Sequence, residues 1–218
     1  MKRIIFVAFV ALALTTGCKK DVIMTETRVT TLDVEYLSAA SVAMKGMASY
    51  SKIGPYKYVG FQYSTSADFT DSKEGEGFYD GHDYFTRRFP GLTPSTRYYY
   101  RAFVCQHDRY TYGETREFTT LPVSTLVETL DYTTEVQDYV TLRCKVCLTN
   151  TLFSIVEYGF YAGPSEAEMT MLHSTYGLPE GEVFSWNCPD SYYSGQFYYK
   201  AFVRLDDVTY YGEMKHYQ

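Results

Sequence analysis

The chain has 218 residues, a formal net charge of −6 and 45% hydrophobic residues, which is enough apolar material for one or two globular cores. Nucleic acid as a partner is disfavoured, because an acidic chain repels phosphates and no basic run offsets this balance. The 24 tyrosines favour strands over helices, since a ring with a polar tip suits a half-buried pleated surface.

The first 17 residues have the pattern of an export signal. Lys2 and Arg3 precede an unbroken apolar run at 4–14, which is shorter than the about 20 apolar residues that span a bilayer. We therefore assign residues 1–17 to a signal peptide and residues 18–27 to an N-terminal tether.

Cys18 follows this signal directly. The segment Thr15-Thr16-Gly17-Cys18 resembles the lipobox of bacterial lipoproteins, in which the cysteine is acylated and becomes the mature N-terminus. The resemblance implies lipidation at Cys18, the membrane as a partner through that lipid, and an outer-membrane location on the cell surface or the periplasmic face. The alternative is an ordinary signal peptide with an incidental cysteine.

An internal repeat determines the architecture. The segment Tyr98–Val104 (YYYRAFV) recurs as Phe197–Val203 (FYYKAFV), and the motif Tyr-Gly-Glu at 112–114 recurs at 211–213. Both pairs are 99 residues apart, an interval that fits a duplicated domain and exceeds that of a solenoid repeat. The sequence therefore predicts two copies of one domain.

The two copies are assigned to residues 28–120 and 121–218. Period-two alternation between turns rich in Gly, Pro, Asp and Ser predicts six or seven short strands in each, which is typical of a β-sandwich. The predicted strands are 29–37, 41–48, 59–64, 84–89, 98–106 and 112–119, and then 125–132, 139–148, 155–161, 169–174, 183–187, 197–205 and 210–217. The predicted fold class is all-β, with a separate core in each sandwich.

The approach to the strand at 98–106 carries a family resemblance. Leu92-x-Pro94-x-Thr96-x-Tyr98 resembles the E–F corner and F strand of fibronectin type III domains. The resemblance implies two tandem fibronectin type III-like (immunoglobulin-like) β-sandwiches in a Bacteroides-type lipoprotein. It gives Tyr98 the role of a structural corner, with a buried ring and a hydroxyl bonded to nearby backbone. Phe197 stands at this position in the second copy, so packing alone is expected to hold that corner.

The predicted linker between the copies is Thr120-Leu121-Pro122-Val123. Pro122 fixes its own φ angle and biases the preceding residue towards extended backbone. A linker this short and stiff predicts a semi-rigid rod.

The outward face of strand F is the candidate binding face. Side chains alternate along a strand, and those opposite the core are Tyr99, Arg101 and Phe103 in the first copy and Tyr198, Lys200 and Phe202 in the second. An aromatic–cation–aromatic row can stack on sugar rings or anchor a protein partner. The alternative is that these rings cover a neighbouring strand or reflect β propensity alone.

Four cysteines lie within the predicted domains. The spacing of Cys144 and Cys147 is that of a redox or zinc motif, but it falls inside an alternating strand, where residues three apart point to opposite faces about 10 Å apart. Cys144 is therefore interpreted as a core residue. The resemblance to fibronectin type III domains implies that Cys188 lies near Tyr139 rather than near Cys147, and Cys105 belongs to the other copy. We expect no disulfide, although export would permit one.

The sequence carries no recognisable catalytic motif. Its four histidines are scattered, and neither a Gly-rich phosphate loop nor a Gly-x-Ser-x-Gly elbow is present. The stretch 79–83, with Asp80, His82 and Asp83, is interpreted as a polar turn rather than a calcium or acid–base site. We expect no enzyme activity, no cofactor and no bound metal.

The leading hypothesis is a non-catalytic, membrane-anchored binding or spacer module for a protein or glycan partner at the cell envelope, an inference by analogy with the fold. One alternative is a glycan-binding accessory protein of a polysaccharide-uptake system, which requires a flat row of exposed aromatic rings. Another is a hydrolase, which requires carboxylates or a nucleophile–base pair that converge from different loops. The sequence specifies neither the ligand, nor the membrane leaflet, nor the oligomeric state.

Overall fold

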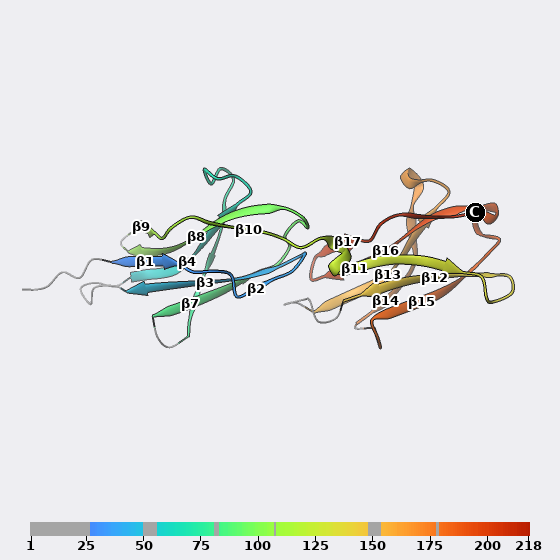
Figure 1. Ribbon diagram of the computed structural model, residues 1–218, viewed down its shortest axis with the longest axis horizontal. Helices are drawn as coiled ribbons and strands as arrows, with labels where there is room; N and C mark the ends of the chain where they lie inside the picture. The colour runs from blue at the N-terminus through green and yellow to red at the C-terminus, as the bar shows by residue number, and fades with distance from the viewer. Residues whose placement is uncertain (1–26, 50–55, 81–82, 107, 148–153, 178) are drawn as a thin grey trace, which may run out of the picture.

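The computed structural model describes residues 27–49, 56–80, 83–106, 108–147, 154–177 and 179–218, and it shows two β-sandwiches that follow one another along the long axis of the molecule (Figure 1). The predicted signal peptide and nearly all of the predicted tether, including Cys18, lie outside these residues. In the described ranges, no helix has the length and apolar character needed to cross a membrane.

The first sandwich, module 1, is built from two antiparallel sheets. Its described strands are β1 (Arg28–Thr31), β2 (Tyr36–Leu37), β3 (Val42–Ser49), β4 (Tyr56–Ser64), β5 (Lys73–Glu76), β6 (Phe78–Tyr79), β7 (Tyr84–Phe89), β8 (Arg97–Gln106), β9 (Arg109–Tyr112) and β10 (Arg116–Thr119). One sheet has the order β1-β3-β7-β6, with β2 also paired to β3. The other has the order β10-β8-β4-β5, with β9 also paired to β8.

The second sandwich, module 2, repeats this plan. Its described elements are η1 (Val123–Thr125), β11 (Val127–Thr133), β12 (Tyr139–Val146), β13 (Ile155–Gly163), η2 (Glu166–Glu168), β14 (Thr170–Tyr176), β15 (Val183–Pro189), η3 (Tyr192–Gly195), β16 (Phe197–Leu205), β17 (Val208–Tyr211) and β18 (Lys215–Tyr217). One sheet has the order β11-β12-β15, and the other has the order β14-β13-β16-β17, with β18 also paired to β16. The prediction of an all-β, fibronectin type III-like chain of two sandwiches is confirmed.

Three predicted strands are each split in the structure. The strand predicted at 29–37 is β1 and β2, the strand at 112–119 is β9 and β10, and the strand at 210–217 is β17 and β18. The last two breaks begin at Gly113 and Gly212, whose N–H groups still donate to the carbonyls of Ala102 and Ala201 in the neighbouring strand.

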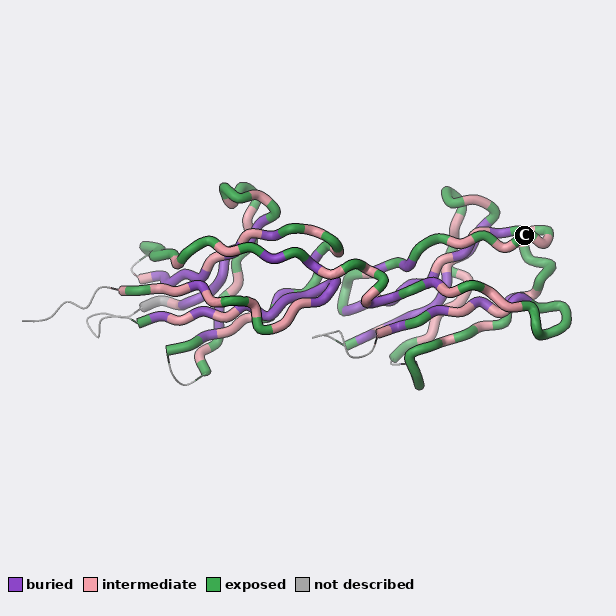
Figure 2. The backbone as a smooth tube through the Cα atoms, in the orientation of Figure 1, coloured by how far each residue is buried: buried purple, intermediate pink, exposed green. Residues whose placement is uncertain are grey.

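Alternating side chains fill the interior between the sheets. In β8, Tyr100, Ala102 and Val104 are buried against Phe61 and Phe85. Figure 2 shows buried stretches along the facing strands of both sandwiches and at the junction between them. The two modules have separate hydrophobic clusters, as expected, but the cluster of module 2 also includes Ala39 and Ala40 of module 1.

Candidate functional site

The predicted binding face lies on strand F, which is β8 in module 1 and β16 in module 2, but the last ring of each row is covered. Tyr99 and Arg101 in β8 are partly exposed, whereas Phe103 is 0% exposed. In β16, Tyr198 and Lys200 are likewise partly exposed and Phe202 is 1% exposed. Phe103 and Phe202 are therefore not free to contact a partner, and the expected row is interrupted at these two positions.

Tyrosines of the neighbouring strands cover Phe103. Tyr58 from β4 lies edge-on at 5.7 Å between ring centroids, and Tyr110 and Tyr112 from β9 lie at 5.1 and 6.2 Å. The hydroxyls of Tyr58 and Tyr110 are 2.6 Å apart, and this hydrogen bond raises the pKa of Tyr110 to about 12. The alternative considered from the sequence, that rings of strand F are covered by neighbouring strands, therefore applies to Phe103.

Arg101 is held between two aromatic rings. Its guanidinium lies 3.7 Å from the ring centroid of Tyr112 and 4.1 Å from that of Phe69. Its Nε donates to Oε1 of Gln62 at 2.8 Å, and the Gln62 amide donates to Ser72 at 2.8 Å. Phe69 adopts a left-handed φ of 61° in a tight turn, an uncommon conformation for a bulky residue, and its ring reaches Arg101 from there. No pattern in the sequence indicated this contact.

Module 2 has a related cluster with different partners. The Lys200 ammonium lies 4.5 Å from the ring centroid of Tyr211, and Tyr161 contacts both Phe202 and Tyr211, at 5.2 and 5.5 Å. Tyr198 stacks on His216 at 4.4 Å. In each module, strand F thus carries a cation that packs on a tyrosine ring, Arg101 on Tyr112 and Lys200 on Tyr211. Both cations make these contacts within their own module.

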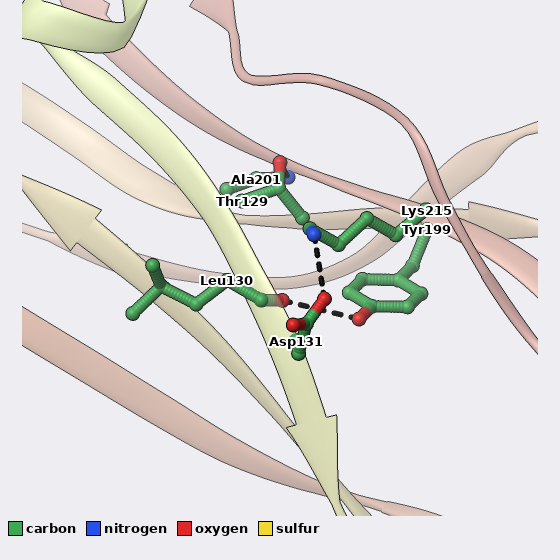
Figure 3. Close-up of polar contacts among 6 residues, drawn as sticks. All are labelled: Thr129, Leu130, Asp131, Tyr199, Ala201 and Lys215. Atoms are coloured by element: carbon green, nitrogen blue, oxygen red, sulfur yellow. Dashed lines mark hydrogen bonds and ion pairs between the residues drawn. The ribbon is translucent and has the colours of Figure 1, made fainter.

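The repeated motifs form a seam that joins the first strand of module 2 to strand F (Figure 3). The Ala201 N–H donates to the Thr129 hydroxyl at 3.0 Å, and the Tyr199 hydroxyl donates to the Leu130 carbonyl at 3.1 Å. Lys215 contributes an ion pair with Asp131 at 2.6 Å. A Cβ on Gly212 would lie 2.6 Å from the Thr129 hydroxyl oxygen, so only glycine fits beside the seam.

Module 1 contains the same seam. The Ala102 N–H donates to the Thr31 hydroxyl at 2.9 Å, the Tyr100 hydroxyl donates to the Leu32 carbonyl at 2.8 Å, and Arg116 pairs with Asp33. Burial raises the pKa of Tyr100 to about 12 and raises the pKa of Tyr199 as well. The repeated sequence motifs therefore have a structural role in both modules, which is to join the first strand to strand F.

Tyr98 lies at the turn into strand F. Its buried ring stacks on Phe118 at 5.5 Å, and its hydroxyl accepts a hydrogen bond from the Thr93 N–H at 3.0 Å. At the matching position, Phe197 packs against Tyr193 and Tyr217, at 5.9 and 5.2 Å.

The cysteines in the described residues carry free thiols. Cys144 and Cys188 are fully buried, and burial raises their pKa values to about 12 and about 11. Cys188 lies opposite Val140, next to Tyr139. Within the described ranges, no three His, Cys, Asp or Glu side chains are grouped so that they could hold a metal ion. Residues 81–82 of the predicted polar turn lie outside those ranges.

The sequence did not predict the contact between the two modules, which we call the module junction. Tyr210 of β17 is 5% exposed, and its hydroxyl donates to the Leu92 carbonyl of module 1 at 3.1 Å. The Leu92 N–H in turn donates to the carbonyl of Ala40, and Ala39 and Ala40 pack into the core of module 2. Module 1 has Thr111 where module 2 has Tyr210, and this difference between the copies is the sequence feature that could have indicated the contact.

Hydrogen bonds also tie the linker to module 1 at the junction. The Ser38 hydroxyl accepts from the N–H groups of Ala40 and Ser41, which fixes the turn that enters the second core. The Leu121 N–H donates to the Ser38 carbonyl at 3.2 Å, and the Ser95 N–H donates to the Leu121 carbonyl at 3.1 Å. The linker therefore lies against the junction instead of spanning a gap.

Comparisons with known proteins find similar solved structures for single modules. The sensor domain of the anti-sigma factor RsgI4 from Pseudobacteroides cellulosolvens is 16% identical, covers 44% of this chain and 95% of its own, and has a TM-score of 0.37. The fibronectin type III domain of human fibronectin type III domain containing protein 3 is 19% identical, covers 43% of this chain and 84% of its own, and has a TM-score of 0.30. No protein-family model and no curated protein matches the sequence.

Proposed function

We propose that this protein is a non-catalytic, lipid-anchored spacer that presents a binding surface for a protein or glycan partner at the cell envelope. The module junction is the observation that carries this proposal. Because Ala39 and Ala40 pack into the second core and Tyr210 bonds to Leu92, the two sandwiches are expected to move as one elongated body (Figure 1). A rigid body of this kind keeps whatever it binds at a fixed distance from its anchor.

The anchor in this proposal is Cys18. The positive start, the apolar run at 4–14 and the cysteine occur in the order that a lipoprotein signal requires. Each buried CH₂ contributes roughly 0.8 kcal/mol, so two or more acyl chains hold a protein stably on a membrane. We propose the outer membrane, on the surface or the periplasmic face, as the location of the anchored protein.

The packing of two histidines supports a non-catalytic role. The His173 ring stacks on Phe184 and Trp186, and burial lowers its pKa, which favours the neutral ring. His216 is stacked on Tyr198. Both rings serve as packing surfaces in the sandwich, and the His173 Nε2 also lies 3.3 Å from the hydroxyl of Thr175, two positions along the same strand.

A glycan-binding accessory protein for polysaccharide uptake is the second candidate, and one observation favours it. Tyr110 and Tyr112 are 39% and 36% exposed, and their rings are 13° from parallel with centroids 5.7 Å apart. Exposed aromatic rings of this kind can stack on sugars. Loss of glycan-array binding on Tyr112→Ala, but not on Tyr176→Ala, would favour this candidate, and silence across the array would favour a protein partner.

Metabolic labelling with an alkynyl fatty acid tests the anchor. Wild-type protein should carry the label and pellet with membranes, and Cys18→Ala should lose the label and leave the pellet. An unlabelled wild type, or a label that survives Cys18→Ala, contradicts the anchor. Small-angle X-ray scattering of the unlipidated chain tests the spacer, and a distribution of bent shapes in place of one extended shape would contradict it.

A further inference from the structure

Module 1 and module 2 differ at one edge of the sandwich. In module 1, β6 pairs with β7, with Phe78 opposite Thr86 and Tyr79 opposite Phe85, and the Asp80 N–H donates to the Tyr84 carbonyl at 3.1 Å. In module 2 the strand that matches β7 is β15, and it is the last strand of the order β11-β12-β15. No described residue pairs with the outer side of β15.

The backbone groups left open on β15 follow from its pairing with β12. The Val146 N–H donates to the Glu182 carbonyl and the Asp190 N–H donates to the Asp138 carbonyl, which sets the alternation of hydrogen-bonded pairs along these antiparallel strands. By that alternation, Val183, Ser185 and Asn187 direct their N–H and C=O groups away from β12, and they match residues of β7 that face β6. The next outward position of β15 is Pro189, which has no N–H and closes that end of the edge, so the open stretch is confined to these three residues, none of which is charged.

A hollow lies beside this open edge. It has a volume of about 440 Å³ and is lined in part by Tyr158, Val183, Phe184 and Ser185. In module 1 the Tyr79 ring of β6 packs on Phe85, the match of Phe184, at 5.8 Å between centroids. In module 2 the stack of Phe184, His173 and Trp186 stays half-buried, and Val183 remains 49% exposed.

We propose that β15 receives an extended segment of a partner protein as an additional antiparallel strand, with an aromatic side chain placed in the hollow beside Phe184. Main-chain hydrogen bonds would supply affinity and the hollow would select the side chain. The sequence of β6 indicates the occupant: an aromatic pair preceded by Gly77, whose Cβ would lie 2.7 Å from Phe85. Exposed Glu180 lines the hollow and favours a segment with basic flanks, whereas the nearby Glu182 is paired with Lys145 at 3.8 Å.

This inference rests on the proposed binding role and gives it a partner class and a place. The probe is the synthetic peptide Lys-Thr-Gly-Phe-Tyr-Thr-Lys, titrated into the full chain while amide hydrogen exchange is followed by NMR. The expected result is at least tenfold slower exchange at Val183, Ser185 and Asn187 in the presence of saturating peptide. Ser185→Pro removes one outward N–H and should abolish the effect, and Ser185→Ala, which keeps that N–H, should retain it.

A second arm does not depend on the folding of a variant. Phe78 and Thr86 form a hydrogen-bonded pair by the alternation that the bond from Asp80 to Tyr84 sets, so N-methylation of the peptide phenylalanine should remove binding. Equal binding of the N-methylated peptide, protection elsewhere, or no binding would overturn the proposal. So would dimerisation of the chain that Ser185→Pro abolishes, because the edge would then serve a second copy. The lipid label and the scattering shape are independent of all these outcomes.

Discussion

At the scale of single residues, the glycine of the repeated Tyr-Gly-Glu motif has no room for a side chain in either seam. The ideal Cβ of Gly212 would lie 2.6 Å from the hydroxyl oxygen of Thr129 and 2.8 Å from its backbone nitrogen. Neither neighbour is the end of a flexible side chain. A methyl group at this position must therefore displace backbone, although glycine and alanine differ by one carbon.

Gly212→Ala should lower the free energy of unfolding of module 2 by roughly 1–3 kcal/mol, the usual cost of overpacking a filled interior. Urea denaturation measures this change. Gly181→Ala is the matched control, because a Cβ there has no heavy atom within 4 Å, and it should change stability little. Equal stability of the two variants would show that the seam relaxes without cost.

Buried tyrosines should make the protein sensitive to alkaline pH. Burial raises the pKa values of Tyr100 and Tyr210 from 10.0 to about 12. The folded state thus favours the neutral phenol, so the contribution to stability is complete below pH 10 and is lost as the pH rises through about 12. Urea unfolding at a series of pH values measures the decline. Tyr210→Phe should show a shallower decline above pH 10, and a flat wild-type profile from pH 9 to 12 would contradict the prediction.

At the scale of elements, the corner that precedes strand F differs between the modules. Tyr98→Phe removes the hydroxyl that accepts the Thr93 N–H, and it should destabilise module 1 by about 1 kcal/mol, the net worth of one hydrogen bond. Chemical denaturation again measures the change, and Tyr176→Phe, which alters a ring 74% exposed, serves as the control. Unchanged stability of Tyr98→Phe would mean that ring packing alone holds this corner too.

The strands differ in how far the sequence could predict them. The strands at 84–89 and 197–205 were predicted with the observed bounds. Apolar residues alternate without interruption in the second, whereas Arg87 stands between Phe85 and Phe89 in the first. β5, with the sequence Lys-Glu-Gly-Glu, was missed because its residues have low β propensity and it forms only by pairing with β4. Alternation within a segment predicts that the segment is a strand, but it does not identify the strand with which it pairs.

The candidate face shows the same limit for side chains. Alternation placed Tyr99, Arg101 and Phe103 on one side of strand F correctly, but it could not show that Tyr58 and Tyr110 cover Phe103. Tyr58 is 45 positions away along the chain, so its contact is a product of tertiary packing. A binding surface depends on exposed side chains, and the sequence therefore could not predict which side chains of this face are exposed.

At the scale of the whole molecule, the duplicated domain acquired a contact that a single domain does not need. Tyr210 stands in place of Thr111, and the turn that contains Ala39 and Ala40 belongs to the second core. Small residues in that turn let the two modules approach closely, and the bond from Tyr210 to the Leu92 carbonyl satisfies a buried acceptor. The fixed arrangement of the two modules therefore depends on few side chains. A substitution among them should part the modules without unfolding either sandwich.

Ala40→Asp tests this separation. Ala40 is 1% exposed, and an unpaired carboxylate in that position would cost several kcal/mol if the junction stayed closed, so the modules should part. In ¹⁵N relaxation measurements, the wild type should tumble as one elongated body and the variant as two modules with shorter and distinct correlation times. Thr111→Asp, at the position in module 1 that matches Tyr210, is exposed and should leave the tumbling unchanged. If Ala40→Asp still tumbles as one body, the linker and its bonds to Ser38 and Ser95, rather than the apolar contact, hold the modules together.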